Sequence, residues 1–184
     1  MHPVFQKSVQ ALVTGELIRT RYAVPGDLDA VNAMHARCTV KSVIGRYRAP
    51  RFGIRPAEWS RLTDPATGSS WVAEHLGEPG RVIAVAHLAH TGREGVRELG
   101  LLVQDDWQYR GLGTALARHA VRHGRRTGCR TVVITTGEQN GAMRSIAHRL
   151  GAPAPIRMLG DLEFTVPLPG HDEHPYPGGR VTVP

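Results

Sequence analysis

The residues in this chain best suited to chemistry lie in one short segment, 108–113, with the sequence QYRGLG. Gly111 and Gly113 have no Cβ, so a ligand can approach the main chain closely there. The segment precedes a helical pattern, so its backbone N–H groups would lie at a helix start, where the helix dipole favours negative charge. These features predict a phosphate or pyrophosphate site. The residues predicted to bind the ligand are Gln108, Tyr109, Arg110, Gly111, Leu112, Gly113 and Thr114.

The neighbouring segments predict a strand before this loop and a helix and a second strand after it. Residues 99–103 form a short apolar run, as expected for a strand. From residue 111 to residue 127 the apolar side chains recur at helical spacing, arginines occupy the other positions, and Gly128 ends the pattern. Residues 131–136, TVVITT, are mostly β-branched and uncharged, which is typical of a buried strand.

Two kinds of phosphate site use such a unit, and the spacing separates them. A dinucleotide fingerprint needs a small residue at the sixth position of GxGxxG and an acidic residue after the next strand, but this chain has Leu116 and Thr136 there. The pattern (Gln or Arg)xxGx(Gly or Ala) fits without a gap at Gln108, Gly111 and Gly113. This segment resembles motif A of the GNAT acyltransferase superfamily, which binds the pyrophosphate of acetyl-CoA.

The resemblance covers most of residues 15–168. Residues 140–152, NGAMRSIAHRLGA, resemble the second cofactor segment of the family, with Asn140 before a helix that ends in Leu and Gly. Residues 37–47 resemble a segment found in modules related to bacterial protein-lysine acetyltransferases. The resemblance implies an α/β (α+β) fold with a central mixed, mostly antiparallel sheet of about six or seven strands, flanked by about four helices. The matched elements are 17–22, 27–38, 70–75 and 82–88.

Composition indicates one globular domain. The chain has 184 residues, 41% of them hydrophobic and 21% charged, which is enough for one core. We expect a GNAT domain over 15–168, an extension of unclear structure over 1–14, and an extended or disordered Pro/Gly-rich tail over 169–184. A short helix is expected at 56–62. No membrane span or signal peptide is expected, which predicts a cytoplasmic protein, and two distant cysteines indicate buried free thiols.

The charge raises the question of nucleic acid. The formal net charge is +7, but the arginines are scattered from Arg19 to Arg180. Helix-turn-helix spacing and an aromatic stacking strip are both missing, so nucleic acid is an unlikely main partner. Arginines near the loop would instead attract a phosphorylated cofactor. His119 and His123 lie four apart but have no third ligand, so we expect no metal site and place both on a solvated basic helix face.

The resemblance also assigns roles to residues 98–103. In the GNAT fold the motif A strand diverges from the next strand, so the backbone groups of Leu101, Leu102 and Val103 would bind the pantetheine arm and polarise the thioester carbonyl. Glu98 is the expected general base, at a place where related bacterial lysine acetyltransferases carry a Glu. Partial burial would disfavour its charged form and make it a better proton acceptor. The alternative is that Glu98 only pairs with Arg97 or another arginine at a strand edge.

The leaving thiolate has no evident general acid. Many GNAT enzymes have a Tyr seven residues after the Asn of the second segment, where this chain has Ala147. The resemblance implies acetyl transfer from acetyl-CoA to a primary amine. Because neither cysteine has an evident partner base, we expect this transfer to occur in a ternary complex. The acceptor stays open between a protein lysine and a small amine, and a homodimer also stays open. The alternative is a catalytically inactive module that binds acetyl-CoA.

Overall fold

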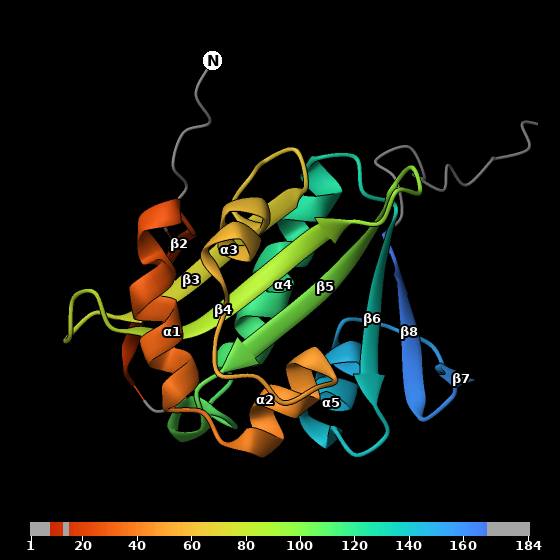
Figure 1. Ribbon diagram of the computed structural model, residues 1–184. Coiled ribbons are helices and arrows are strands. Elements are labelled where there is room, and N and C mark those ends of the chain that lie inside the picture. Colours follow the sequence, from red (N-terminus) through yellow and green to blue (C-terminus); the bar gives the residue numbers. More distant parts are fainter. Residues whose placement is uncertain (1–7, 13–14, 169–184) are drawn as a thin grey trace, which may run out of the picture.

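The computed structural model of this chain describes residues 8–12 and 15–168. The tail over 169–184, expected to be extended or disordered, lies outside the described residues, as do 1–7 and 13–14. One mixed sheet and helices on both of its faces make up the described part (Figure 1).

Eight strands in the described residues form the sheet in the order β1-β2-β3-β4-β5-β6-β8-β7. Only the β5–β6 pair is parallel, and all the others are antiparallel. The strands are β1 (Ser8–Ala11), β2 (Leu17–Tyr22), β3 (Gly68–His75), β4 (Val82–His90), β5 (Val96–Val103), β6 (Thr131–Gly137), β7 (Ile156–Met158) and β8 (Asp161–Pro167).

Five α-helices in the same residues cover the two faces of this sheet. Figure 1 shows α1, α2 and α3 in front of the sheet and α4 behind it. The α5 helix packs with α4, because Met143 and Ile146 join the same apolar cluster as Leu112 and Leu116. The helices are α1 (Leu28–Ala36), α2 (Val40–Tyr47), α3 (Pro56–Leu62), α4 (Leu112–Arg126) and α5 (Gly141–Arg149).

The predicted fold class is confirmed, with one strand and one helix more than the approximate numbers expected. The additional strand β1 comes from the segment 1–14, whose structure the sequence left unclear. The additional helix α2 is held at its start by distant groups: Thr39 caps it, and Asp105 accepts hydrogen bonds from Thr39 N and Thr39 Oγ1 at 2.9 and 2.8 Å. The short helix expected at 56–62 is α3.

The core has one layer on each face of the sheet. Behind it, α4 and α5 bury a cluster that includes Trp71, Leu116 and Phe164. In front, α1 and α3 bury a second cluster around Met34 and Trp59. Burial of large apolar side chains on both faces fixes the central strands, so the sheet is a rigid support for residues at its open places.

Candidate active site

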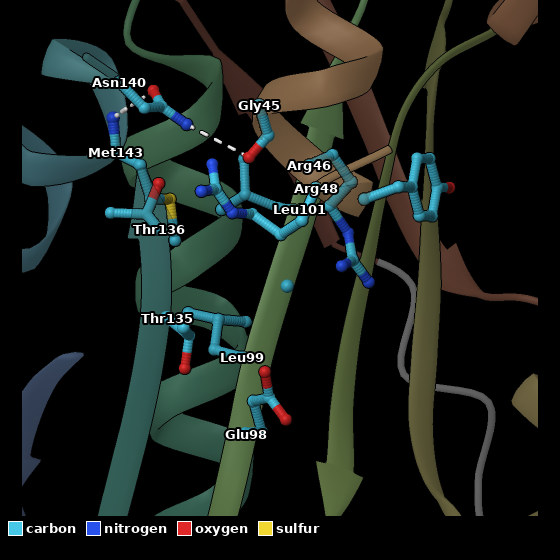
Figure 2. Close-up of a pocket in the computed structure, with 12 residues that line it drawn as sticks. Gly45, Arg46, Arg48, Glu98, Leu99, Leu101, Thr135, Thr136, Asn140 and Met143 are labelled. Carbon is cyan, nitrogen blue, oxygen red and sulfur yellow. Dashed lines mark hydrogen bonds between the residues drawn. The ribbon is translucent and has the colours of Figure 1, made fainter. Parts of the chain in front are cut away.

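The site begins where β5 and β6 separate. The two parallel strands pair only at Val96 with Thr131, Arg97 with Val132 and Glu98 with Val133, and β6 then continues along β8. A cavity of about 270 Å³ opens beyond the last pair (Figure 2). Its lining residues are Gly45, Arg46, Tyr47, Arg48, Glu98, Leu99, Gly100, Leu101, Thr135, Thr136, Asn140 and Met143.

The backbone of Leu101 faces this gap. Gln104 N donates to Ile83 O on β4 at 2.9 Å, and hydrogen bonding alternates along an antiparallel strand. The N–H and C=O groups of Leu101 and Val103 therefore point away from β4, towards the side that β6 has left. Leu101 also lines the cavity, so its backbone can reach a ligand there, as the sequence predicts.

Two of the neighbouring predicted residues are placed differently. Leu102 is 3% exposed in the front apolar cluster, and the same alternation turns its backbone towards β4. Val103 O accepts a hydrogen bond from Gln108 Nε2 at 2.9 Å. Of the three residues predicted to polarise the carbonyl, the structure leaves the backbone of Leu101 facing the cavity, engages Val103 O internally, and directs Leu102 into the sheet and core.

The predicted phosphate loop precedes α4, as expected. Gly111 stands before the first helical residue with φ 89°, a conformation that glycine adopts without strain, and Tyr109 has φ 57°. The first intrahelical bond runs from Ala115 N to Gly111 O at 3.0 Å. The preceding N–H groups of Leu112, Gly113 and Thr114 therefore have no intrahelical partner and lie at the positive end of the helix.

The polar side chains of the loop are engaged within the protein. Gln108 Nε2 also donates to Ser42 Oγ at 3.0 Å, and Gln108 N donates to Asp105 O. Arg110 forms an ion pair with Glu16 at 2.6 Å and lies over the ring of Trp107 at 5.2 Å. The loop therefore offers main-chain N–H groups to an anion, whereas its Gln and Arg side chains shape the loop itself.

Gly113 and Thr114 have unequal surroundings. A Cβ atom at Gly113 would lie 3.1 Å from Ile146 Cδ1, so this glycine permits close packing of α4 on α5. Thr114 is half-buried and accepts a hydrogen bond from the exposed Arg149 Nη1 at 3.4 Å. Arg149 was not predicted, and it adds a positive charge beside the helix start.

Asn140 bridges the two sides of the gap. Its Oδ1 accepts from Met143 N at 3.1 Å, which caps α5, and its Nδ2 donates to Gly45 O of α2 at 3.4 Å (Figure 2). On the same side, Arg48 forms an ion pair with Asp161 of β8. The predicted cofactor-binding Asn140 therefore lines the cavity and links α2 to the start of α5.

Glu98 lines the cavity, but the expectation of partial burial is wrong. The side chain is exposed, because β6 pairs with β5 only as far as this residue. The alternative pairing with Arg97 is also not seen: Arg97 donates instead to Thr127 Oγ1 and Thr127 O at 2.7 and 2.9 Å. Glu98 thus faces the open part of the cavity, where an acceptor can reach it.

Arg46 also lines this cavity, although no pattern in the sequence singled it out. Arg46 extends from α2 across the face of β5, and its guanidinium occupies the space where Gly100 lacks a side chain. Its Nε is buried without a hydrogen-bond partner in the described residues, and Thr136 Oγ1 in the same cavity is likewise unpaired. Buried polar atoms are nearly always hydrogen-bonded, so these two atoms indicate a place for a polar ligand.

His119 and His123 are not on a solvated face, contrary to the sequence-based expectation. His123 bonds Tyr22 Oη and Ser69 Oγ, each at 3.0 Å, and both histidine rings meet Trp71 edge-on. Burial lowers the pKa of His123 to about 4, with Arg97 and Arg126 adding to the effect. The described residues contain no group of three or more His, Cys, Asp or Glu arranged to hold a metal ion.

Comparisons with known proteins agree with this geometry. The sequence model of the acetyltransferase (GNAT) family matches residues 37–152. The GNAT domain of PAT from S. lividans superposes with a TM-score of 0.81 at 21% identity, over 91% of this chain and 100% of that one. A putative acetyltransferase from Salmonella typhimurium, solved with its cofactor acetyl-CoA, gives 0.66 at 21% identity over 87% and 97%. These two likenesses show the fold.

The chain belongs to the acetyltransferase (GNAT) family. The predicted membership of the GNAT family is thereby confirmed. Acetyltransferase Pat of Mycolicibacterium smegmatis is 28% identical over 165 residues, which are 89% of this chain and 49% of that protein. The chain therefore spans about half the length of this curated relative. No helix among residues 8–12 and 15–168 is long and apolar enough to span a bilayer.

Proposed function

We propose that this chain transfers the acetyl group of acetyl-CoA to a primary amine in a ternary complex. The observation that carries the proposal is the separation of β5 from β6 after Glu98, which opens a cavity lined by Leu101, a residue that also packs close to Gly113 at the start of α4. A pyrophosphate at the helix start and a thioester in the gap would bring one ligand to both places.

The residues divide the work between binding and proton transfer. The N–H groups of Leu112, Gly113 and Thr114, with Arg149 nearby, would hold the pyrophosphate of acetyl-CoA. The backbone of Leu101 would hold and polarise the thioester carbonyl. Glu98 would accept a proton from the amine while the nitrogen of the amine bonds to the carbonyl carbon of the thioester. The carbon–sulfur bond would then break, and the CoA thiolate would leave and take up a proton from solvent.

Direct transfer is supported by the state of the two cysteines. Burial raises the pKa of the Cys38 thiol to about 11, and Asp105 adds to this effect. Cys129 is buried, and its thiol donates to Thr131 O at 3.1 Å. Neither thiol is therefore suited to form an acyl-enzyme at neutral pH. Both are free, which also favours a reducing compartment such as the cytoplasm.

One observation favours the alternative of an inactive module that binds acetyl-CoA. Ala147, at the position where many relatives have a Tyr, is fully buried among apolar side chains and supplies no proton. The deciding experiment incubates the purified chain with acetyl-CoA and a panel of amines that includes lysine peptides, and measures free thiol and acetylated amine. Amine-dependent thiol release supports the enzyme, and cofactor binding without release from any amine supports the inactive module.

A further inference from the structure

Arg46 is a cation that no carboxylate of the described residues holds in an ion pair. Within the described residues it has no ion pair and no hydrogen bond, and its nearest favourable contact is the ring of Tyr47, 4.9 Å from its Cζ. The other arginine in the cavity, Arg48, is neutralised by Asp161. Arg46 is half-buried, its Nε is fully buried, and a charged group partly shielded from water without an ion pair is costly, so Arg46 is suited to a ligand that brings a negative charge.

The carboxylates near Arg46 act on it without forming an ion pair. Burial lowers the pKa of its guanidinium, while Tyr47, Glu98 and Glu58 act in the opposite direction and Arg51 adds to the lowering. Arg51 is itself held in an ion pair by Glu58 at 2.5 Å. The phosphates of a cofactor bound at the start of α4 would be held by that helix, so the anion for Arg46 has to come from the other substrate.

The distance between Arg46 and the proposed base limits what that substrate can be. Glu98 and Gly100, over which Arg46 lies, are two residues apart on one strand, so they share a face and their Cα atoms are about 7 Å apart. An acceptor that meets both groups must carry its amine and its negative charge close together.

We infer that the acceptor is a free amino acid, whose amine meets Glu98 and whose carboxylate pairs with Arg46. This inference rests on the proposed acetyl transfer and names its substrate class. The planar guanidinium offers two parallel N–H donors to a carboxylate, which is the geometry of strong bidentate pairs. A lysine side chain in a protein has no carboxylate within this distance of its amine, so it would leave Arg46 unpaired.

The test compares amino acids with amines that differ only in the carboxylate. Phenylalanine and methionine are paired with 2-phenylethylamine and 3-(methylthio)propylamine, and a lysine peptide blocked at both ends is the third kind of acceptor. We expect kcat/KM for each amino acid to exceed that for its decarboxylated partner by about 100-fold, because a buried charge left unpaired is strongly penalised. Calorimetric titration of the CoA-bound protein should show the same order of affinity.

Three variants locate the preference. Arg46→Met should reduce the ratio between amino acid and amine to within about threefold, and Arg46→Lys should keep part of it by raising KM more than it lowers kcat. Arg118→Met is the matched control, because it removes one arginine from an exposed position on α4 and should leave the ratio unchanged. Thermal unfolding of each variant checks that it is folded.

The outcomes distinguish a failure of the amino-acid preference from a failure of the proposed acetyl transfer. Transfer to the lysine peptide or to the decarboxylated amines at rates equal to or above those of the amino acids overturns the inference and leaves the acetyltransferase in place. An amino-acid preference that survives Arg46→Met in a folded protein also overturns it. Absence of thiol release with every acceptor overturns the proposed function itself.

Discussion

The loop that begins α4 and the cavity between β5 and β6 are linked by Leu101, which lines the cavity and packs close to Gly113, yet they present different chemical groups to a ligand. The loop offers main-chain N–H groups, while the side chains of Gln108 and Arg110 are engaged elsewhere in the protein. The cavity instead offers side chains, with an exposed carboxylate at Glu98 and an unpaired cation at Arg46. Under the proposed function, the loop would hold the pyrophosphate and the cavity would distinguish between acceptors.

This difference implies that the two regions can be damaged separately. A change in the side chains of the cavity should alter turnover or acceptor choice while cofactor binding persists. A change of charge at the start of α4 should weaken cofactor binding first. Variants that fail to separate in this way would show that the two regions act as one.

The largest effect is expected from Glu98→Gln. This change keeps the size of the side chain and removes the proton acceptor, so kcat should fall by about 100-fold or more, as is typical for loss of a general base. The shift in melting temperature caused by acetyl-CoA should stay the same, because the helix start is untouched. Steady-state kinetics and thermal unfolding measure the two quantities. Glu94→Gln, at an exposed position outside the cavity, is the control and should behave as wild type.

A smaller effect in the opposite region is expected from Thr114→Glu. A carboxylate in the first turn of α4 interacts favourably with the helix dipole. The melting temperature of the protein without cofactor should therefore stay the same or rise slightly. The same charge repels the pyrophosphate, and affinity for acetyl-CoA should fall by about tenfold, measured by calorimetry. Thr114→Gln is the neutral control. Undiminished affinity in Thr114→Glu would move the phosphate site away from the start of α4.

The next effect in size is expected in the stability of the protein, from Asp105→Asn. The Asp105 carboxylate accepts bonds from Thr39 N, Thr39 Oγ1 and Ser42 Oγ and so fixes the start of α2. Loss of these charge-assisted bonds should lower the free energy of unfolding by about 1–2 kcal/mol, measured by urea denaturation. The exposed neighbour change Asp106→Asn should cost less. Equal stability of both variants would show that α2 does not depend on this cap.

The smallest effect is expected in how the free energy of unfolding depends on pH. The pKa of His123 is about 4 in the folded protein, below its ordinary value of 6.5, so between these values the unfolded chain binds the proton more readily. The free energy of unfolding should therefore decline as pH falls from 6.5 towards 4. His123→Gln should make this decline shallower, and His90→Gln, at the exposed end of β4, should not. If activity between pH 4 and 6.5 is lost together with the folded state, that loss does not report the titration of Glu98.

The sequence predicted the loop because its recognition elements are contiguous. Two glycines, a strand before them and a helix after them all lie within one stretch of chain, so local patterns suffice. Arg46 could not be found in this way. Its importance depends on Gly100 lying beneath it and on the lack of an ion pair or hydrogen bond to it among the described residues, and both facts arise only when α2 packs on β5.

The wrong expectations have the same cause. Glu98 was expected to be partly buried because its strand is apolar, but the early departure of β6 exposes it. His123 was expected in solvent because arginines flank it on the helix, but Tyr22 and Ser69 from two other strands bond both of its ring nitrogens. Helical periodicity reports which residues share a face, and it does not report what the rest of the fold brings to that face.

The anchoring of α2 has a consequence for protein engineering. The Ser42 hydroxyl of this helix donates a hydrogen bond to Asp105 and accepts one from Gln108, so the segment that carries Arg46 is anchored to the turn and the loop that precede α4. Grafting α2 from a relative to change acceptor choice would break these hydrogen bonds unless Ser42, Asp105 and Gln108 are transplanted together. The exchangeable unit in this molecule is therefore the helix with its attachment, two pieces that are more than sixty residues apart in the chain.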